Sequence, residues 1–436
     1  MYQTINRITE SINHYLVLFA ITLPTLQGCD KNNDPPPANN PPVITSISPD
    51  NGVFNTVVTI NGSNFTNSDT VKINGKKAEV IAVSATQLSV KVPTLAGSGA
   101  VSITTTGNKT ISGPGFTFTY TATATTLAGD GTQGYRDGAG NQAQFSFLWQ
   151  ICIDKPGNVY VTDADEHYWI RKILKDGTVS TYASGVATQW SDIADGPVST
   201  TKLFAPHGLA INQNNEMFLA EQYFIRKINL TNNTIAKYTG SFTPGYKDGA
   251  LAEALYDGAT VITVDTLNGD VYVFDENNKR LRKISAGGTV TTVLGDGNAD
   301  LDIDAMTPAK KGGIYLGGWA DTRIRYLSPS GTETTIAGSS ERDYKDGKGT
   351  DARFRNIVGL AEDTGGDLFV ADRGNNRIRL IDKNNNVITV AGTGERAFQD
   401  GTNSDIKFAG LDGMVSGGDG VLYVIDGYRI RKVVVQ

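Results

Sequence analysis

One short pattern recurs along the chain and limits the possible fold more than any other feature. An aromatic residue, a basic or polar residue, Asp-Gly and a second aromatic residue occur in the same order at 135–145, 246–256, 344–354 and 398–408. Two further motifs recur in this order: a strand-like segment that ends in an acidic residue, and then Ile-Arg-Lys or a variant of it. The basic motif begins at six positions: Ile170, Ile225, Leu281, Ile324, Ile378 and Ile430. This order, repeated at intervals of 43 to 56 residues, indicates six similar structural units.

The units are made of short strands. Each unit alternates apolar and polar residues over about four short segments, and none contains a convincing amphipathic helix. Four-stranded units of this length predict a β-propeller, whose closure leaves only short protected edges. The last unit lacks its outer strand, while a spare strand-like segment at 123–131 precedes the first unit. We therefore expect a six-bladed propeller over 123–436 in which the N-terminal strand completes the last blade.

The unit at 346–381 resembles the NHL repeat in its bacterial form. It contains Asp346-Gly347, Ala352, Phe354, "GLAED" and "DLFVADRGNNRIRLI". The resemblance covers the whole of 123–436, with one departure: the fourth unit has no Asp-Gly loop. We expect Asp-Gly to supply a turn residue with positive φ and the second aromatic residue to pack between neighbouring blades. Both elements, and the arginine of the basic motif, are therefore predicted to be architectural.

Residues 42–120 predict a separate small domain. Short alternating segments such as "VVTINGSNF", "QLSVKVP" and "AVSITTTG" are divided by turn residues, which favours a β-sandwich. The wording also resembles the IPT/TIG family of immunoglobulin-like domains, in "PVITSISPDNGVFNTVVTINGSNF" and "VKINGKKAEV". That resemblance implies a spacer or binding module and no catalysis. The overall expectation is an all-β chain with an immunoglobulin-like sandwich followed by a propeller.

The N-terminus predicts export. Arg7 precedes an apolar run at 15–26 that is too short to span a bilayer, so 1–28 is interpreted as a signal peptide. Leu26-Gln27-Gly28-Cys29 resembles the lipobox of bacterial lipoproteins, which implies a lipid on Cys29; the alternative is an ordinary cleaved signal with an incidental cysteine. The proline-rich stretch at 29–41 would then be a flexible tether. These features imply a lipid-anchored protein of the outer membrane, on the cell surface or the periplasmic face.

Charge and cysteine content exclude some classes of function. The formal net charge is −6 and there is no basic cluster, which argues against nucleic acid as a partner. The chain has two cysteines, so lipidation of Cys29 would leave Cys152 without a disulfide partner in the mature chain.

Positions that differ between units are the candidates for function. Aligning the units places one residue per blade at the mouth of the central channel: Trp149, His207, Thr260, Asp304, Val358 and Asp412. We expect Trp149, His207, Thr260, Asp304 and Asp412 to contact a ligand. His207, Asp304 and Asp412 come from alternate blades, and a histidine with two carboxylates could bind one divalent metal ion, the candidate cofactor. The alternative is that they are solvated residues of a variable channel rim.

Four tryptophans, Trp149, Trp169, Trp190 and Trp319, occupy positions that are not equivalent between units. Sugar rings stack on aromatic side chains while polar groups bind their hydroxyls. The architecture also looks like lipoproteins of Bacteroidetes-type bacteria, many of which capture polysaccharide. We therefore expect a binding module for glycan or another small ligand. The alternatives are a metal-dependent propeller lyase or hydrolase acting on sugars or lactones, and a scaffold with a protein partner, as the NHL resemblance implies. The sequence identifies no catalytic residue.

Overall fold

The computed structural model describes residues 40–297 and 301–436. The predicted signal peptide at 1–28, the predicted lipid site Cys29 and residues 29–39 of the predicted tether lie outside the described residues. Strands dominate the rest, which confirms the all-β prediction, and no helix in the described part is long and apolar enough to cross a membrane. The helical elements there are single 3-10 turns: η1 (Gly140–Gln142), η2 (Trp190–Asp192), η3 (Val198–Thr200), η4 (Gly349–Asp351), η5 (Arg373–Asn375) and η6 (Asn403–Asp405).

Residues 43–118 form two sheets that pack face to face. The first contains, in spatial order, β1 (Val43–Ser48), β3 (Val57–Ser63), β7 (Gln87–Lys91) and β6 (Glu79–Val83). The second contains β2 (Asn51–Gly52), β9 (Thr110–Phe118), β8 (Gly99–Thr104), β4 (Thr70–Ile73) and β5 (Lys76–Lys77). Alternate residues point inward, so that Val58 and Ile60 of one sheet share a core with Val71 and Ile73 of the other. This is the predicted sandwich.

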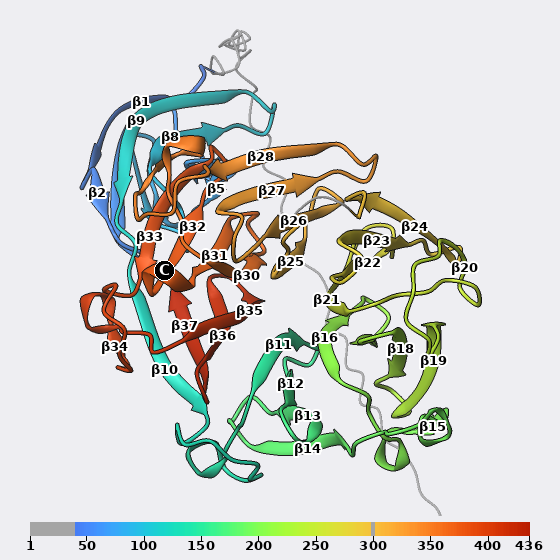
Figure 1. Cartoon of the computed structure of the whole chain (residues 1–436). Coiled ribbons are helices and arrows are strands. Elements are labelled where there is room, and N and C mark those ends of the chain that lie inside the picture. Colours follow the sequence, from blue (N-terminus) through green and yellow to red (C-terminus); the bar gives the residue numbers. More distant parts are fainter. Residues whose placement is uncertain (1–39, 298–300) are drawn as a thin grey trace, which may run out of the picture. The chain divides into compact units, whose positions relative to one another are not determined.

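Six further sheets lie within residues 122–436 (Figure 1), and we number them blades 1 to 6. From the inner strand outward, blade 1 contains β11 (Leu148–Ile153), β12 (Val159–Ala164), β13 (Tyr168–Ile173) and β14 (Val179–Ser184). Blade 2 contains β16 (Pro206–Ile211), β17 (Glu216–Glu221), β18 (Phe224–Asn229), β19 (Thr234–Gly240) and β15 (Gly196–Pro197). Blade 3 contains β21 (Ala259–Val264), β22 (Val271–Asp275), β23 (Arg280–Ile284), β24 (Thr289–Leu294) and β20 (Gly249–Ala250). Blade 4 contains β25 (Ala305–Pro308), β26 (Ile314–Gly317), β27 (Arg323–Leu327) and β28 (Glu333–Gly338). Blade 5 contains β30 (Ile357–Glu362), β31 (Leu368–Asp372), β32 (Arg377–Ile381), β33 (Asn386–Ala391) and β29 (Gly347–Lys348). Blade 6 contains β35 (Leu411–Gly418), β36 (Val421–Asp426), β37 (Ile430–Val435), β10 (Ala122–Ala128) and β34 (Gly401–Thr402).

The blades form a closed ring. Each inner strand contacts the inner strand of the next blade, and β35 of blade 6 contacts β11 of blade 1. Blade 6 is completed by β10, which comes from the other end of the propeller segment and pairs with β37 from Ala122↔Val435 to Ala128↔Ile430. The spare strand that the sequence places before the first unit therefore closes the ring as predicted.

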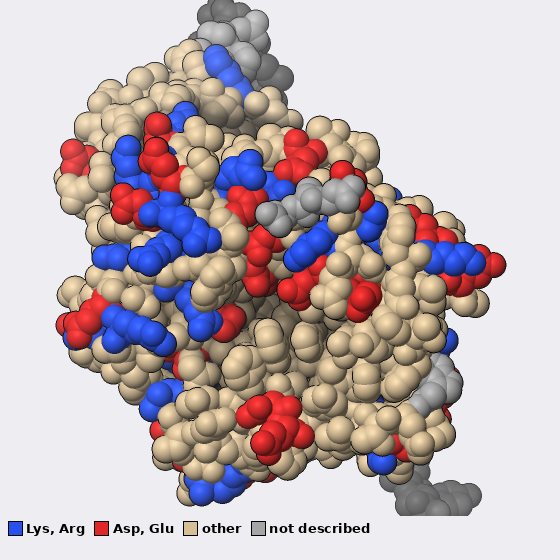
Figure 2. All heavy atoms as spheres, viewed as in Figure 1, with Lys and Arg blue, Asp and Glu red and all other residues tan. Residues whose placement is uncertain are grey.

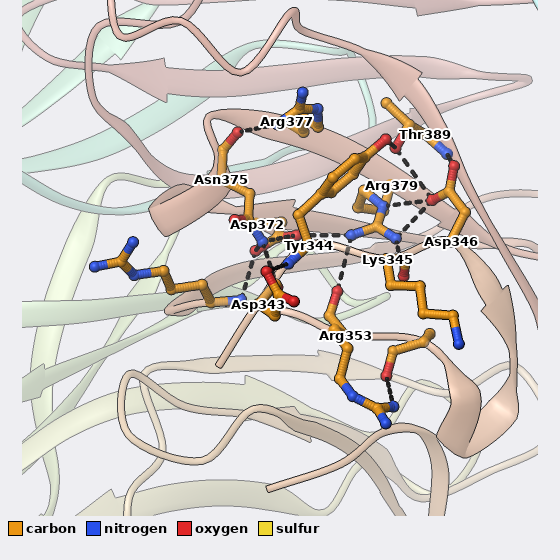
Figure 3. Close-up of polar contacts among 12 residues, drawn as sticks. Asp343, Tyr344, Lys345, Asp346, Arg353, Asp372, Asn375, Arg377, Arg379 and Thr389 are labelled. Atoms are coloured by element: carbon orange, nitrogen blue, oxygen red, sulfur yellow. Dashed lines mark hydrogen bonds and ion pairs between the residues drawn. The ribbon is translucent and has the colours of Figure 1, made fainter. Parts of the chain in front are cut away.

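The repeated Asp-Gly loop holds a buried arginine, as blade 5 shows in Figure 3. Arg379 is fully buried and donates to Asp372, the acid that ends β31, at 2.8 Å, and to Asp346 of the loop at 2.6 Å. Asp346 also accepts the amide hydrogen of Thr389 on β33 at 3.1 Å. The loop thus links β32 and β33 of its own blade. Equivalent buried arginines are Arg171, Arg282 and Arg431, while Arg226 pairs with Glu221 in blade 2.

Both aromatic residues of the repeat contact this arginine. In blade 5 the guanidinium carbon of Arg379 is 5.0 Å from the ring centroids of both Tyr344 and Phe354, within the range of a cation–π contact. Phe354 is fully buried and packs with Ile324 of blade 4, so the second aromatic residue lies between neighbouring blades as expected. Among the described residues, blade 1, which has the Asp-Gly loop, and blade 4, which lacks it, each have four strands.

Candidate ligand-binding site

The inner strands surround a cavity of about 490 Å³, and polar and aromatic side chains line its mouth. Figure 2 shows the hollow at the centre of one propeller face. Five blades contribute the second residue of their inner strand, and blade 4 contributes the residue just before it. The six positions predicted for the channel mouth all line this cavity: Trp149, His207, Thr260, Asp304, Val358 and Asp412. Their contact with a ligand stays a prediction.

The inner strands also contribute apolar residues to the lining, each of which belongs to a hydrophobic core cluster as well. These residues are buried and line the same cavity: Ile151, Leu209, Ile262, Met306, Leu360 and Met414. Gln150, Thr263 and Thr307 line the cavity too, so its lining away from the mouth is mixed apolar and polar.

Blades 1 and 2 supply an aromatic wall. The Trp149 ring stacks on His207, with ring centroids 4.8 Å apart and planes 10° apart. The ring centroid of Phe147 lies 4.9 Å from that of Trp149. Burial lowers the pKa of His207, so the imidazole is neutral at pH 7. His207 Nδ1 and Thr260 Oγ1 are buried and have no hydrogen-bond partner among the described residues.

Blade 4 supplies a second tryptophan. Trp319 follows β26 and is 45% exposed, and Trp149 is 44% exposed. The Trp319 carbonyl oxygen accepts hydrogen bonds from Asn356 at 2.9 Å and Arg342 at 3.0 Å. Its ring lies 5.3 Å from the guanidinium carbon of Arg373. Because blades 1 and 4 are opposite each other in a ring of six, the two tryptophans stand on opposite sides of the opening.

Charged groups are concentrated on blades 3 to 6. Arg373 forms an ion pair with Asp412 between blades 5 and 6 and donates to the Leu411 carbonyl at 3.0 Å. Burial raises the pKa of Asp412 to about 6, although the Arg373 charge opposes that shift. Burial and the neighbouring Asp302 carboxyl raise the pKa of Asp304 to about 7. The mouth thus has an uncharged aromatic side and a charged side, which Figure 2 shows as tan and as red and blue surface around the hollow.

The predicted metal site does not form. Within residues 40–297 and 301–436, no three histidine, cysteine, aspartate or glutamate side chains are grouped closely enough to hold a metal ion. His207 stacks on Trp149, Asp412 binds Arg373, and Asp304 accepts the Trp319 amide hydrogen at 2.6 Å. Each of the three proposed ligands is thus engaged with a different partner on its own side of the mouth, which corrects the expectation of a shared metal ion.

The alignment of inner strands missed part of the wall. Glu276, Trp319 and Arg373 line the cavity from the segments that join the second and third strands of their blades. Glu276 and Arg373 each follow directly the acid that ends the second strand. The same repeat alignment could therefore have found these two, whereas Trp319 lies in the blade that departs from the repeat.

The remaining aromatic candidates lie elsewhere. Trp169 is on β13 and packs against Tyr135, with ring centroids 4.9 Å apart, and over Arg171. Neither Trp169 nor His167 lines the cavity. The side chain of Trp190 lies outside the described part of the structure. Cys152 is buried without a disulfide, and burial raises the pKa of its thiol.

Comparison with known proteins identifies the sandwich and the general fold. A family model for the IPT/TIG domain matches residues 42–120, which confirms that prediction. The chain is 25% identical over 276 residues to "Protein SUPPRESSOR OF QUENCHING 1, chloroplastic" of Arabidopsis thaliana, a match over 59% of this chain but only 22% of that protein's length.

Several solved structures match nearly the whole chain, two of which illustrate the likeness. A structural genomics protein of unknown function from Bacteroides thetaiotaomicron is 18% identical with a TM-score of 0.66, covering 92% of this chain and 99% of that one. An auxiliary nutrient binding protein from Bacteroides ovatus is 17% identical with a TM-score of 0.57, covering 91% and 98%. At these identities the likeness shows the fold alone.

Proposed function

We propose that this chain is a binding protein of the bacterial envelope that holds a glycan in its central cavity. The observation that supports this most directly is the pair of half-exposed tryptophans, Trp149 and Trp319, on opposite sides of an opening of about 490 Å³. That volume lies within the usual range for small-molecule sites.

The chemistry of the mouth suits a sugar. The apolar faces of a pyranose ring can stack on the two indoles, and its hydroxyl groups can bind Asp304, Asp412, Thr260 and His207. The name of the Bacteroides ovatus structure, an auxiliary nutrient binding protein, agrees with this proposal. The proposed lipid on Cys29 and the tether at 29–41 would hold the IPT/TIG domain and the propeller at the outer membrane.

Neither alternative gains comparable support. The metal-dependent lyase or hydrolase needs a ligand set that the described residues do not group together. The protein scaffold needs a docking surface, and no single feature of the described surface favours one over the cavity.

The test is affinity electrophoresis of the purified protein in gels that contain soluble glycans, with Trp149→Ala and Trp319→Ala as the informative variants. Each substitution removes a stacking surface, so we expect the affinity for a retarding glycan to fall about tenfold or more. Leu267→Ala is the matched control, because Leu267 is 66% exposed and does not line the cavity. Retardation that survives both tryptophan substitutions would place the glycan elsewhere and contradict the proposal.

A separate experiment tests the anchor. Cells that express the wild-type chain and a Cys29→Ser variant are labelled with an alkyne fatty acid. We expect label on the wild type and none on the variant; equal labelling of both would show that Cys29 is not the lipid site.

A further inference from the structure

Blade 1 departs from the repeat at one position of its third strand. Two residues before the buried arginine, blades 3, 5 and 6 carry a second arginine, at Arg280, Arg377 and Arg429. Each of these stacks on the first aromatic residue of its own Asp-Gly loop, with 3.9 to 4.0 Å between the guanidinium carbon and the ring centroid. Blade 1 has the half-buried Trp169 at this position, and blade 2 has the fully buried Phe224.

Tyr135, the first aromatic residue of the blade 1 loop, also has different partners from its equivalents. Its ring centroid lies 4.9 Å from that of Trp169 and 4.5 Å from that of His167. In blades 3 and 5 the equivalent tyrosine hydroxyls form hydrogen bonds with Thr292 at 3.2 Å and Thr389 at 3.0 Å. The Tyr135 hydroxyl has no hydrogen-bond partner among the described residues. A cluster of three aromatic rings thus replaces the stack of arginine on an aromatic ring that the other blades use.

This cluster lies at the same end of the blade as the cavity mouth. β11 begins at the mouth and runs away from it, and the antiparallel β12 returns, so the loop that joins β12 to β13 is at the mouth end. His167 lies in this loop, and Trp169 is the second residue of β13. The end of β12 is bonded to the mouth: the Ala164 amide donates to the Phe147 carbonyl at 2.9 Å, and the Ala164 carbonyl accepts from Trp149 Nε1 at 3.3 Å.

The two tryptophans of blade 1 are too far apart to share one sugar ring. Leu148, which precedes Trp149, pairs with Asp163, and Asp163 in turn pairs with Trp169. The backbones of the two tryptophans are therefore two strand spacings apart, which is about 10 Å. A ligand in contact with both must be a chain of several rings.

The groups around the cluster suit the hydroxyls of such a chain. Asp165, Glu166 and His167 are exposed in the loop between β12 and β13. Asp165 accepts hydrogen bonds from Ser146 at 3.2 Å and from Gln133 at 3.4 Å, so its carboxylate is held beside the aromatic rings. Aromatic faces next to carboxylate and amide groups combine stacking with hydrogen bonding, as at the mouth.

We propose that Tyr135, His167 and Trp169 form an extension site for a glycan chain whose other part occupies the central cavity. The chain leaves the cavity past Trp149 and crosses the loop at 165–167. The chemical class of this ligand rests on the function proposed above. Because only a chain of several rings reaches both sites, the protein should prefer long chains to short ones.

Trp169→Arg tests the extension site with the residue that blades 3, 5 and 6 have at this position, so the variant should fold. Affinity electrophoresis compares it with the wild-type full chain in gels that contain xylan, mannan or starch. We expect the affinity for a retarding polysaccharide to fall about tenfold, since a stacking surface is lost. The disaccharide of the same polymer, added as a competitor, should bind both proteins equally, because it fills the cavity alone.

Leu174→Arg is the matched control. Leu174 is 38% exposed and follows β13 at the end away from the mouth, so the substitution adds the same charge to the same blade. Both affinities should stay unchanged. His167→Ala keeps the test decisive if Trp169→Arg folds poorly, because it alters an exposed loop residue and should also weaken binding of the polysaccharide but not of the disaccharide. Polysaccharide affinity that is equal in the wild type, Trp169→Arg and His167→Ala would overturn the proposal.

The same gels distinguish the extension site from the function on which it rests. If Trp149→Ala and Trp319→Ala abolish retardation and Trp169→Arg does not change it, the extension site fails and the proposed function stands. If Trp169→Arg abolishes retardation and both mouth variants keep it, the cavity fails as the glycan site while the site on blade 1 stands. Absence of retardation by all three polysaccharides would contradict both.

Discussion

At the scale of single residues, the ion pairs of the buried arginines contribute to the stability of the propeller. Arg379 has no contact with solvent, and its charge is balanced by fully buried Asp372 and partly exposed Asp346. A buried charge that loses its partner is strongly destabilising, because desolvation is no longer compensated. The cost of a substitution should therefore depend on how deeply the acid is buried.

We predict that Asp372→Asn lowers the free energy of unfolding by about 3 kcal/mol, because it leaves Arg379 without its fully buried counter-charge. Asp346→Asn should cost less, about 1 kcal/mol, since solvent screens that carboxylate. Urea denaturation of the two variants checks this order. Equal losses would contradict it.

The second prediction at this scale concerns pH. The pKa of Asp304 is raised to about 7 from its usual value near 4, so the folded chain holds a proton there that the unfolded chain has released. Stability from this group is present below about pH 4 and is lost as pH rises to about 7. We expect Asp304→Asn to lose that part of the pH dependence of Tm, with Asp165→Asn as control. The same pH dependence in wild type and Asp304→Asn would contradict this.

At the scale of elements, the repeat in the sequence was sufficient to predict the strands of each blade and the residues of the inner strands that face the channel. Strand alternation placed Trp149, His207 and Asp412 at the mouth, because one residue in two on an inner strand must face the channel. It could not place Trp319, which lies in the irregular blade, where its amide donates to Asp304 and the next amide donates to Asp302.

The metal hypothesis failed for a related reason. Blade order showed that His207, Asp304 and Asp412 reach the same opening, but contacts between neighbouring blades decide where each side chain points. Asp412 turns to Arg373, and His207 turns to Trp149. Such pairings depend on tertiary packing, which periodicity does not reveal.

The closing strand gives a prediction of its own. Asp400 binds Arg431 on β37 at 2.8 Å and the Thr126 amide on β10 at 2.8 Å, so it fastens the strand that closes the ring. We expect Asp400→Ala to speed amide hydrogen exchange across residues 122–128, since β10 is not joined to β37 by a hairpin. Asp346→Ala is the matched control: in blade 5 the outer strand follows its neighbour directly in the chain, so exchange there should rise less. Similar increases in both would contradict a special role in closure.

At the scale of the whole molecule, the sandwich and the propeller share contacts. Lys76 of β5 binds Asp367 at 2.7 Å, and Asp367 is almost fully buried. Leu95 joins a core cluster whose other buried residues all belong to the propeller, among them Ala122 and Ala124 of β10. These contacts predict that the two domains unfold together.

Lys76→Ala should test this coupling. We expect it to cost about 3 kcal/mol and to separate one calorimetric transition into two, because Asp367 would be left buried without a counter-charge. Lys91→Ala is the control, since its pair with Glu79 is exposed and should contribute less than about 1 kcal/mol. A single, unshifted transition for Lys76→Ala would show that the domains are not coupled through this pair.

The residues beneath the mouth determine how strongly a solute can be held there. Ile151, Leu209 and Met414 offer no side-chain hydrogen bonds, so a solute that reaches them must replace its water of hydration with contacts to Gln150, Thr263, Thr307 or backbone groups. We therefore expect small, partly apolar solutes to enter further than strongly hydrated ones.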